Sequence, residues 1–150
     1  MRGRDAEQWA LRIRYPRRRL DKLGVKPGAR VSVIGFEDRA FQAELRERTS
    51  DIAKNEPKPD SDLVFVFMKE RAELAKLKPL RAAIKADGAI WVLWTKGRRE
   101  FREDDVRAAG PMLGLVDVKV VAFSEALSGL KMVIPVAQRP RKKETERTKR

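Results

Sequence analysis

The chain has 150 residues, the size of one domain, and 35 Lys and Arg against 22 Asp and Glu give it a net charge of +13. It contains neither cysteine nor histidine, which excludes disulfides, thiolate metal sites and a Ser-His-Asp hydrolase, so we expect no metal site. No apolar run approaches the ~20 residues that a membrane-spanning helix needs. A soluble, cytoplasmic protein without a membrane partner is therefore expected.

The positive charge is concentrated at the two ends. Residues 1–30 hold 10 basic and 3 acidic residues, and residues 137–150 hold 7 and 2, which leaves a nearly neutral body. Such ends suit contact with the phosphate backbone of RNA or DNA, and a solubilising role is the alternative. The side chains expected to make nucleic-acid contacts are Arg12, Arg14, Arg17, Arg18, Arg19, Arg139, Arg141, Lys142 and Lys143.

The charge pattern divides the chain into a basic arm at 1–19, an α/β domain at 20–136 and a basic tail at 137–150. In the arm, apolar residues from Trp9 to Tyr15 alternate with polar ones, which favours an extended strand, but their spacing also fits one face of a helix. Both interpretations stay open. The tail has no apolar residue beyond Gln138 that would anchor it, so we expect it to be disordered.

The body alternates strand and helix patterns. A short helix is expected at 18–23, and a strand at 30–35 leads into a helix at 38–48 with Phe41 and Leu45 on its inner face. The loop 49–61 has room for a short edge strand near Ile52. The later expected elements are a strand at 62–68, helices at 70–78 and 79–86, a strand at 89–96, a helix at 103–109 ended by Gly110 and Pro111, and strands at 116–123 and 130–136.

The run at 89–96 is apolar throughout, which is typical of a parallel strand buried on both faces. It follows a turn at Asp87 and Gly88. Trp91 and Trp94 lie three residues apart and should face opposite sides of the sheet. Trp94, nearer the end of the strand, is the one placed to stack on a base or an adenine, with plain core packing as the alternative.

Two phrases resemble class I S-adenosylmethionine (SAM) methyltransferases: the stretch from Leu23 to Val31 before the first strand, and that from Ile84 to Ala89 before the central one. The order of elements is similar too. More closely, four blocks resemble an uncharacterised bacterial family, domain of unknown function 3052. They are Leu23 to Val31, Arg71 to Leu74, Trp94 to Lys96, and Gly114 to Val120 continuing to Ser128 to Lys131.

This resemblance covers about residues 20–136. It implies an α/β three-layer sandwich, the methyltransferase-like Rossmann fold, with a mostly parallel sheet ending in an antiparallel hairpin. The family brings no established activity.

Methyltransferases bind SAM through a glycine-rich turn after the first strand. Laid on that pattern, this chain keeps Gly35 but has Glu37 and Arg39 at the next two glycine positions, and Val33 where the strand usually carries an acid. We interpret Gly35, Glu37 and Asp38 as a degenerate cofactor loop, so no cofactor is expected, with SAM as the alternative. Glu56, near the end of the second strand, remains a candidate for contact with ribose hydroxyls.

If the strand order is that of methyltransferases, hydroxyl and ammonium groups meet at the carboxyl ends of neighbouring strands. Such groups suit a small anion, although lysines are also common there because they are solvated. The residues of this candidate anion site are Lys69, Thr95, Lys96, Ser128, Gly129 and Lys131. Ser124 and Glu125 lie on the same edge. No catalytic residue is assigned, since Glu37, Asp38 and Glu125 are bases by position only.

Three functions follow from these patterns. The first is a non-catalytic binding module, with basic arms on nucleic-acid backbone and an anion site at the sheet edge, which makes an enzyme the less favoured class. The second is a divergent SAM-dependent methyltransferase. The third is a scaffold for protein interactions.

Overall fold

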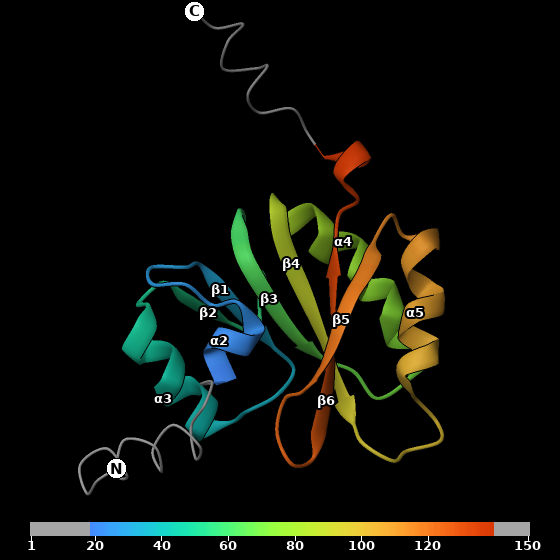
Figure 1. Cartoon of the computed structure of the whole chain (residues 1–150), viewed down its shortest axis with the longest axis horizontal. Helices are drawn as coiled ribbons and strands as arrows, with labels where there is room; N and C mark the ends of the chain where they lie inside the picture. Colours follow the sequence, from blue (N-terminus) through green and yellow to red (C-terminus); the bar gives the residue numbers. More distant parts are fainter. Residues whose placement is uncertain (1–18, 140–150) are drawn as a thin grey trace, which may run out of the picture.

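A computed structural model describes residues 19–139 of the chain, as one mixed sheet with helices on both faces (Figure 1). The elements are α2 (Arg19–Leu23), β1 (Val31–Ile34), α3 (Arg39–Arg48), β2 (Ile52–Lys54), β3 (Ser61–Phe67), the 3₁₀ helix η1 (Arg71–Lys76), α4 (Leu77–Ala83), β4 (Ile84–Thr95), α5 (Glu103–Met112), β5 (Val116–Ala122), β6 (Leu127–Val133) and the short 3₁₀ helix η2 (Val136–Gln138). The question of strand or helix in the arm lies outside the described residues.

The sheet has six strands in the order β2-β1-β3-β4-β6-β5. β1, β2, β3 and β4 run parallel to one another, whereas β6 runs antiparallel to both of its neighbours, β4 and β5. Helices α2 and α3 contribute to the hydrophobic cluster on one face, and η1, α4 and α5 to the cluster on the other. The predicted α/β sandwich with an antiparallel hairpin at its end is confirmed.

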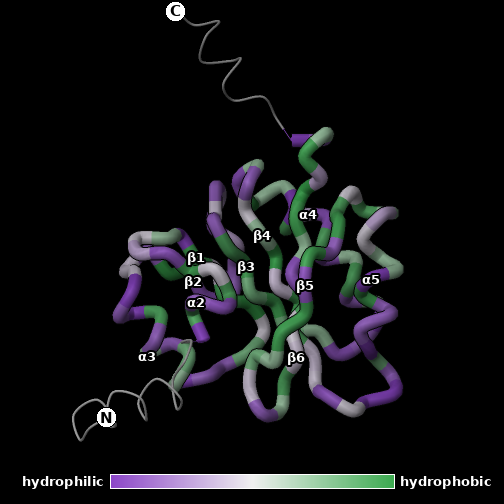
Figure 2. Tube along the Cα trace, in the orientation of Figure 1, coloured by the Kyte–Doolittle hydropathy of each residue, from purple (hydrophilic) through white to green (hydrophobic). Residues whose placement is uncertain are grey.

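β4 is the central element, and its residues from Ala89 to Trp94 are all buried. Trp91 packs in the cluster under α2 and α3, while Trp94 packs in the cluster under α4 and α5, so the predicted opposition of the two indoles is confirmed. The buried Trp91 Nε1–H donates to the carbonyl of Leu23 at 3.0 Å. Figure 2 shows the apolar residues gathered along the central strands.

The lead-in to β4 differs from the prediction. The strand begins at Ile84 rather than Ala89, because Ile84 pairs with Ser61 and Ala89 with Leu63, so the extra residues between them bulge out of the ladder. Gly88 lies inside this bulge, where an added Cβ would stand 2.9 Å from the carbonyl oxygen of Ser61. The expected turn at Asp87 and Gly88 is therefore a bulged part of the strand.

The helix boundaries also differ. Residues 71–76 form a 3₁₀ helix rather than an α-helix, and Pro79 is the third residue of α4 instead of the first, a position whose N–H has no partner within a helix anyway. α5 continues through Gly110 and Pro111 to Met112, so the prediction that this pair ends the helix at 109 was wrong. Gly110 packs closely on β6, since an added Cβ would meet Met132 Cε at 2.8 Å.

The last hairpin is displaced by three residues. β6 starts at Leu127, not at Leu130, because the N–H groups of Phe123 and Ser124 both donate to the carbonyl of Leu127 and close a tight turn. Every residue of β6 therefore lies three positions further from the turn than predicted. In the described part of the chain, no helix is long and apolar enough to cross a membrane.

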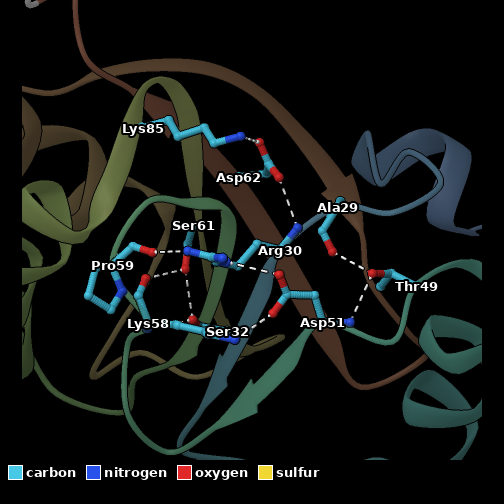
Figure 3. Close-up of polar contacts among 10 residues, drawn as sticks. All are labelled: Ala29, Arg30, Ser32, Thr49, Asp51, Lys58, Pro59, Ser61, Asp62 and Lys85. Atoms are coloured by element: carbon cyan, nitrogen blue, oxygen red, sulfur yellow. Dashed lines mark hydrogen bonds and ion pairs between the residues drawn. The ribbon is translucent and has the colours of Figure 1, made fainter.

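A chain of hydrogen bonds holds the amino end of the sheet together (Figure 3). The buried Ser61 hydroxyl donates to the carbonyl of Lys58, so the buried Ser32 hydroxyl is the donor in the 2.9 Å contact between the two serines. Ser32 Oγ in turn accepts from the N–H of Lys58 at 3.0 Å. These bonds fasten the loop before β3 to β1.

Replacing Ser32 with Ala should lower the free energy of unfolding by about 1–3 kcal/mol, because the N–H of Lys58 and the oxygen of Ser61 would both lose a partner in a buried site. Urea denaturation followed by Trp fluorescence measures the change. Ser50→Ala, at an exposed position, is the control and should stay within about 0.5 kcal/mol of the parent. Equal effects of the two substitutions would contradict this role of Ser32.

Candidate functional site

The carboxyl ends of β1, β2, β3 and β4 meet at one edge of the sheet, the lower edge in Figure 1. Parallel α/β sheets bind their ligands at this edge, because loops and helix N-termini converge there. The strands end at Ile34, Lys54, Phe67 and Thr95. We call this region the carboxyl edge.

The turn after β1 is tight and begins at a glycine. Gly35 is exposed and has a φ of +85°, and a Cβ added there would stand 3.2 Å from the carbonyl oxygen of Phe67. Both facts favour glycine, because an L side chain is strained at positive φ and would crowd β3. Asp38 then starts α3, accepting a hydrogen bond from the N–H of Phe41 at 2.9 Å. Asp38 therefore acts as a helix cap.

Glu37 places a carboxylate beside the end of β2. Its Oε2 lies 3.1 Å from Lys54 Nζ, and its Oε1 accepts from Gln42 Nε2 at 3.3 Å. The hydrogen bond from Lys54, followed by that from Gln42, lowers the pKa of Glu37 below its ordinary value. The lowered pKa keeps this carboxylate ionised, and because the side chain is 70% exposed, the carboxylate is also accessible.

Asn55 lies beside Glu37 at the end of β2. It has a φ of 65°, and its Oδ1 accepts from the N–H of Gly35 at 3.4 Å, which links the turn after β1 to β2. Glu56 is exposed and follows it in the loop.

A basic loop follows β4. A cavity of about 480 Å³ opens there, lined by Trp94, Gly97, Arg98, Arg99, Phe101 and Arg102. Trp94 and Phe101 are buried and meet edge to face, with ring centroids 6.5 Å apart, so they form the floor under the exposed arginines. Sequence reasoning missed this loop as a site, although Lys96, Arg98 and Arg99 form a basic run directly after the central strand.

The candidate anion site is divided by the structure. Lys69, Thr95 and Lys96 lie at the carboxyl edge, and Ser128 joins them because it pairs with Trp94. The turn at Ser124 and Glu125 lies there too, since the N–H of Lys96 donates to the carbonyl of Ala126. The backbone N–H groups of Lys69 and Glu70 do not serve an anion, because both already donate to the carboxylate of Glu73.

The other two residues of that set offer no group to an anion at this edge. Gly129 is buried, and an added Cβ would stand 2.9 Å from Leu93 Cδ2 and 3.3 Å from Trp91 Cε3, so Trp91 covers the backbone that was expected to be bare. Lys131 pairs with Trp91 in the middle of the sheet, about 10 Å along β6 from Ser128. It lines a different cavity, at the opposite edge.

Of the residues expected to contact nucleic acid, the structure describes Arg19 and Arg139. The Arg19 guanidinium donates to Glu44 and to the carbonyl of Phe123, so it is engaged inside the fold. Arg139 Nε donates to the carbonyl of Ile134. The remaining seven lie outside the described residues: Arg12, Arg14, Arg17, Arg18, Arg141, Lys142 and Lys143.

No family model and no curated protein matches the chain. Solved structures do. A putative methyltransferase from Thermoplasma acidophilum is 5% identical with a TM-score of 0.57, over 77% of this chain and 71% of that one. A putative type 11 methyltransferase from Sulfolobus solfataricus is 11% identical with a TM-score of 0.54, over 82% and 93%.

A third similar structure is the magnesium protoporphyrin IX methyltransferase from Synechocystis PCC 6803 with bound SAM. It is 14% identical with a TM-score of 0.53, over 77% of this chain and 74% of that one. At these identities the similarity establishes the fold, and the methyltransferase-like Rossmann fold is confirmed.

These neighbours correct the first functional prediction. The non-catalytic binding module, and with it the preference against an enzyme, rested on the degenerate loop after β1 and is contradicted by neighbours that are methyltransferases. The alternative of a divergent SAM-dependent methyltransferase is the better supported of the two. The loss of two glycines was given too much weight, since the turn at Gly35 is still present and Glu37 places an acid at its side.

Replacing Lys54 with Met should raise the pKa of Glu37 toward its ordinary value, because the contact that lowers this pKa most would be lost. Carboxyl carbon shifts followed by NMR through an acid titration measure the pKa. Lys76→Met is the control, since Lys76 pairs with Glu73 instead. An unchanged Glu37 titration in Lys54→Met would contradict the assigned contact.

Proposed function

We propose that this chain is a divergent SAM-dependent methyltransferase that binds its cofactor at the carboxyl edge over β1, β2 and β3. The observation that carries the proposal is the tight glycine turn between β1 and the capped start of α3, in a fold shared with methyltransferases. This turn is where proteins of that fold bring their backbone close to the cofactor.

The residues of the turn fit a ligand in spite of the two missing glycines. Glu37 and Arg39 are both exposed, and Glu37 is held sideways by Lys54 and Gln42. The side chain of Glu37 therefore need not fill the space above Gly35. The backbone of the turn therefore remains accessible to the amino-acid part of SAM. Methyltransferases with glycine at the next two positions expose this backbone in the same way.

Glu37 is the proposed contact for the ribose. An ionised carboxylate accepts two hydrogen bonds at once and so matches a pair of adjacent hydroxyls. Its pairing with Lys54 keeps it ionised and holds it over the end of β2. Asn55, bonded to the N–H of Gly35, supplies further polar groups beside it. In this chain the acid of the cofactor site comes from the turn rather than from Glu56.

The cavity after β4 is the proposed place of the methyl acceptor. When bound, SAM supplies a methyl group on a cationic sulfur, which is transferred to a nucleophilic atom of the acceptor. Trp94 and Phe101 close the bottom of this cavity but are buried, so the groups that face an acceptor are the exposed arginines, which favour a negatively charged one. This arrangement supports an acceptor that carries an anionic group.

Membership of the domain of unknown function 3052 family is part of this proposal. The blocks that carry the resemblance have clear roles in the structure: Glu73 caps the N–H groups after β3, and Trp94 to Lys96 ends the central strand. The last block contains Gly129, packed under Trp91. Family membership is supported by these roles, because each of the three blocks has a function in the fold or at the carboxyl edge.

Calorimetric titration of the full chain with SAM and with its demethylated product should give micromolar binding. Glu37→Ala should weaken this binding by about 100-fold, because both charge-assisted hydrogen bonds to the ribose would be lost. Glu56→Ala is the matched variant, an exposed acid a few residues away, and should bind as the parent does. Gly35→Val should abolish binding.

Because Gly35→Val would strain a residue at positive φ, circular dichroism must show that the variant is folded. The Glu37→Ala result does not depend on this check of folding, because Glu37 is exposed and its replacement should leave the fold intact. The absence of heat with the folded parent at millimolar cofactor would overturn the proposal. Equal weakening by Glu37→Ala and Glu56→Ala would remove Glu37 from the site.

A further inference from the structure

A second cavity lies at the amino edge of the sheet, the edge opposite the proposed cofactor site. Its volume is about 630 Å³, and it is lined from the α2–β1 connection, from β3 to β6, and from the end of the described chain. Leu63, Ala89 and Val133 form an apolar wall. Lys26, Lys131 and Arg139 bring three positive charges to it.

Lys131 is an unusual residue for the middle of a sheet. It stands opposite Lys119 in the β5–β6 ladder, and like charges directly opposite each other destabilise a pair of strands. Burial and, secondarily, the charge of Lys119 lower the pKa of Lys131. Among residues 19–139, no carboxylate forms an ion pair with either lysine, so the repulsion stays unrelieved.

The ammonium group of Lys131 stands at the wall formed by the chain after α2. Its Nζ lies 3.8 Å from the position that a Cβ would take at Gly24, an ordinary van der Waals distance, so the ammonium reaches this wall. Gly24 and Lys131 both line the cavity. The charge is thus placed where a ligand can reach it.

The acids of this cavity do not neutralise Lys131. Asp62 Oδ2 accepts from the N–H of Arg30, and its Oδ1 pairs with Lys85 at 3.0 Å, as Figure 3 shows. Asp87 adds its charge to the same Lys85. Asp62 is therefore engaged by Arg30 and Lys85, and Asp87, which also lines the cavity, forms no ion pair with Lys131 among the described residues.

We propose that the amino-edge cavity binds a small organic anion, whose phosphate or carboxylate is held by Lys131 at the cavity wall, with Lys119 opposite it in the ladder, and whose apolar body lies on Leu63, Ala89 and Val133. A bound anion relieves the repulsion between the two lysines and forms charge-assisted hydrogen bonds in a partly desolvated place. This site is separate from the cofactor site and goes beyond the proposed function, since the two lie at opposite edges.

The test is an amide NMR titration of the full chain with phenyl phosphate, benzoate, inorganic phosphate and benzyl alcohol. Phenyl phosphate and benzoate each carry an apolar ring and an anionic group, as the expected ligand does. Whichever of the two binds more tightly shows whether the ligand's anionic group is a phosphate or a carboxylate. Saturable shifts are expected at Gly24, Ala89 and Lys131. Inorganic phosphate and benzyl alcohol, which each lack one part, should bind about tenfold more weakly.

Lys131→Met and Lys119→Met should each weaken the binding of the better probe about tenfold, and both should stay folded because each removes one of two repelling charges. Lys76→Met, at an exposed lysine paired with Glu73, is the matched control and should change nothing. Shifts spread over exposed lysines generally, or unchanged affinity in Lys131→Met, would overturn the proposal. SAM binding should be the same in all three variants, so failure here leaves the proposed function untouched.

Discussion

The burial of β4 on both faces is the constraint on which the other features depend. A strand covered on two sides leaves no room for an unpaired polar group, so the indole N–H of Trp91 must find a partner, and it finds the carbonyl of Leu23. That bond sets the end of α2 against the sheet and thereby places Gly24 beside Lys131. On the other face, Trp94 holds Phe101 and with it the basic loop. β4 thus positions Gly24 beside Lys131 at the amino edge and the basic loop at the carboxyl edge.

Much of the fold was predictable because the two periodicities are clear in this sequence. The apolar run of β4 and the spacing of Phe41 and Leu45 in α3 each have one good structural interpretation, and the structure agrees with both. The strand from Ile84 to Gly88 was not predictable, since it has no strand pattern and is extended only because Ser61 pairs with Ile84. Long-range pairing of this kind leaves no local signal.

The candidate site was predicted less well, and the reason is the geometry of one turn. With a last strand expected from Leu130, Lys131 would stand next to the turn and therefore at the carboxyl edge. The actual turn is closed by the N–H groups of Phe123 and Ser124 on the carbonyl of Leu127, which moves Lys131 three residues into the sheet. Hydrophobic alternation fixes which face a residue occupies but is insensitive to its distance from the turn.

The two edges of the sheet differ in how their charges are satisfied. At the carboxyl edge, Lys54 is matched by Glu37, and the pair leaves an ionised carboxylate exposed. At the amino edge, the carboxylate of Asp62 binds the N–H of Arg30 and the ammonium of Lys85. Lys119 and Lys131, which face each other, form no ion pair with any acid of the described residues. A net charge of +13 does not require such a pair, because solvated positions were available for both lysines. Keeping them opposite each other beside an apolar wall costs stability, and a bound anion is the condition under which that arrangement becomes favourable.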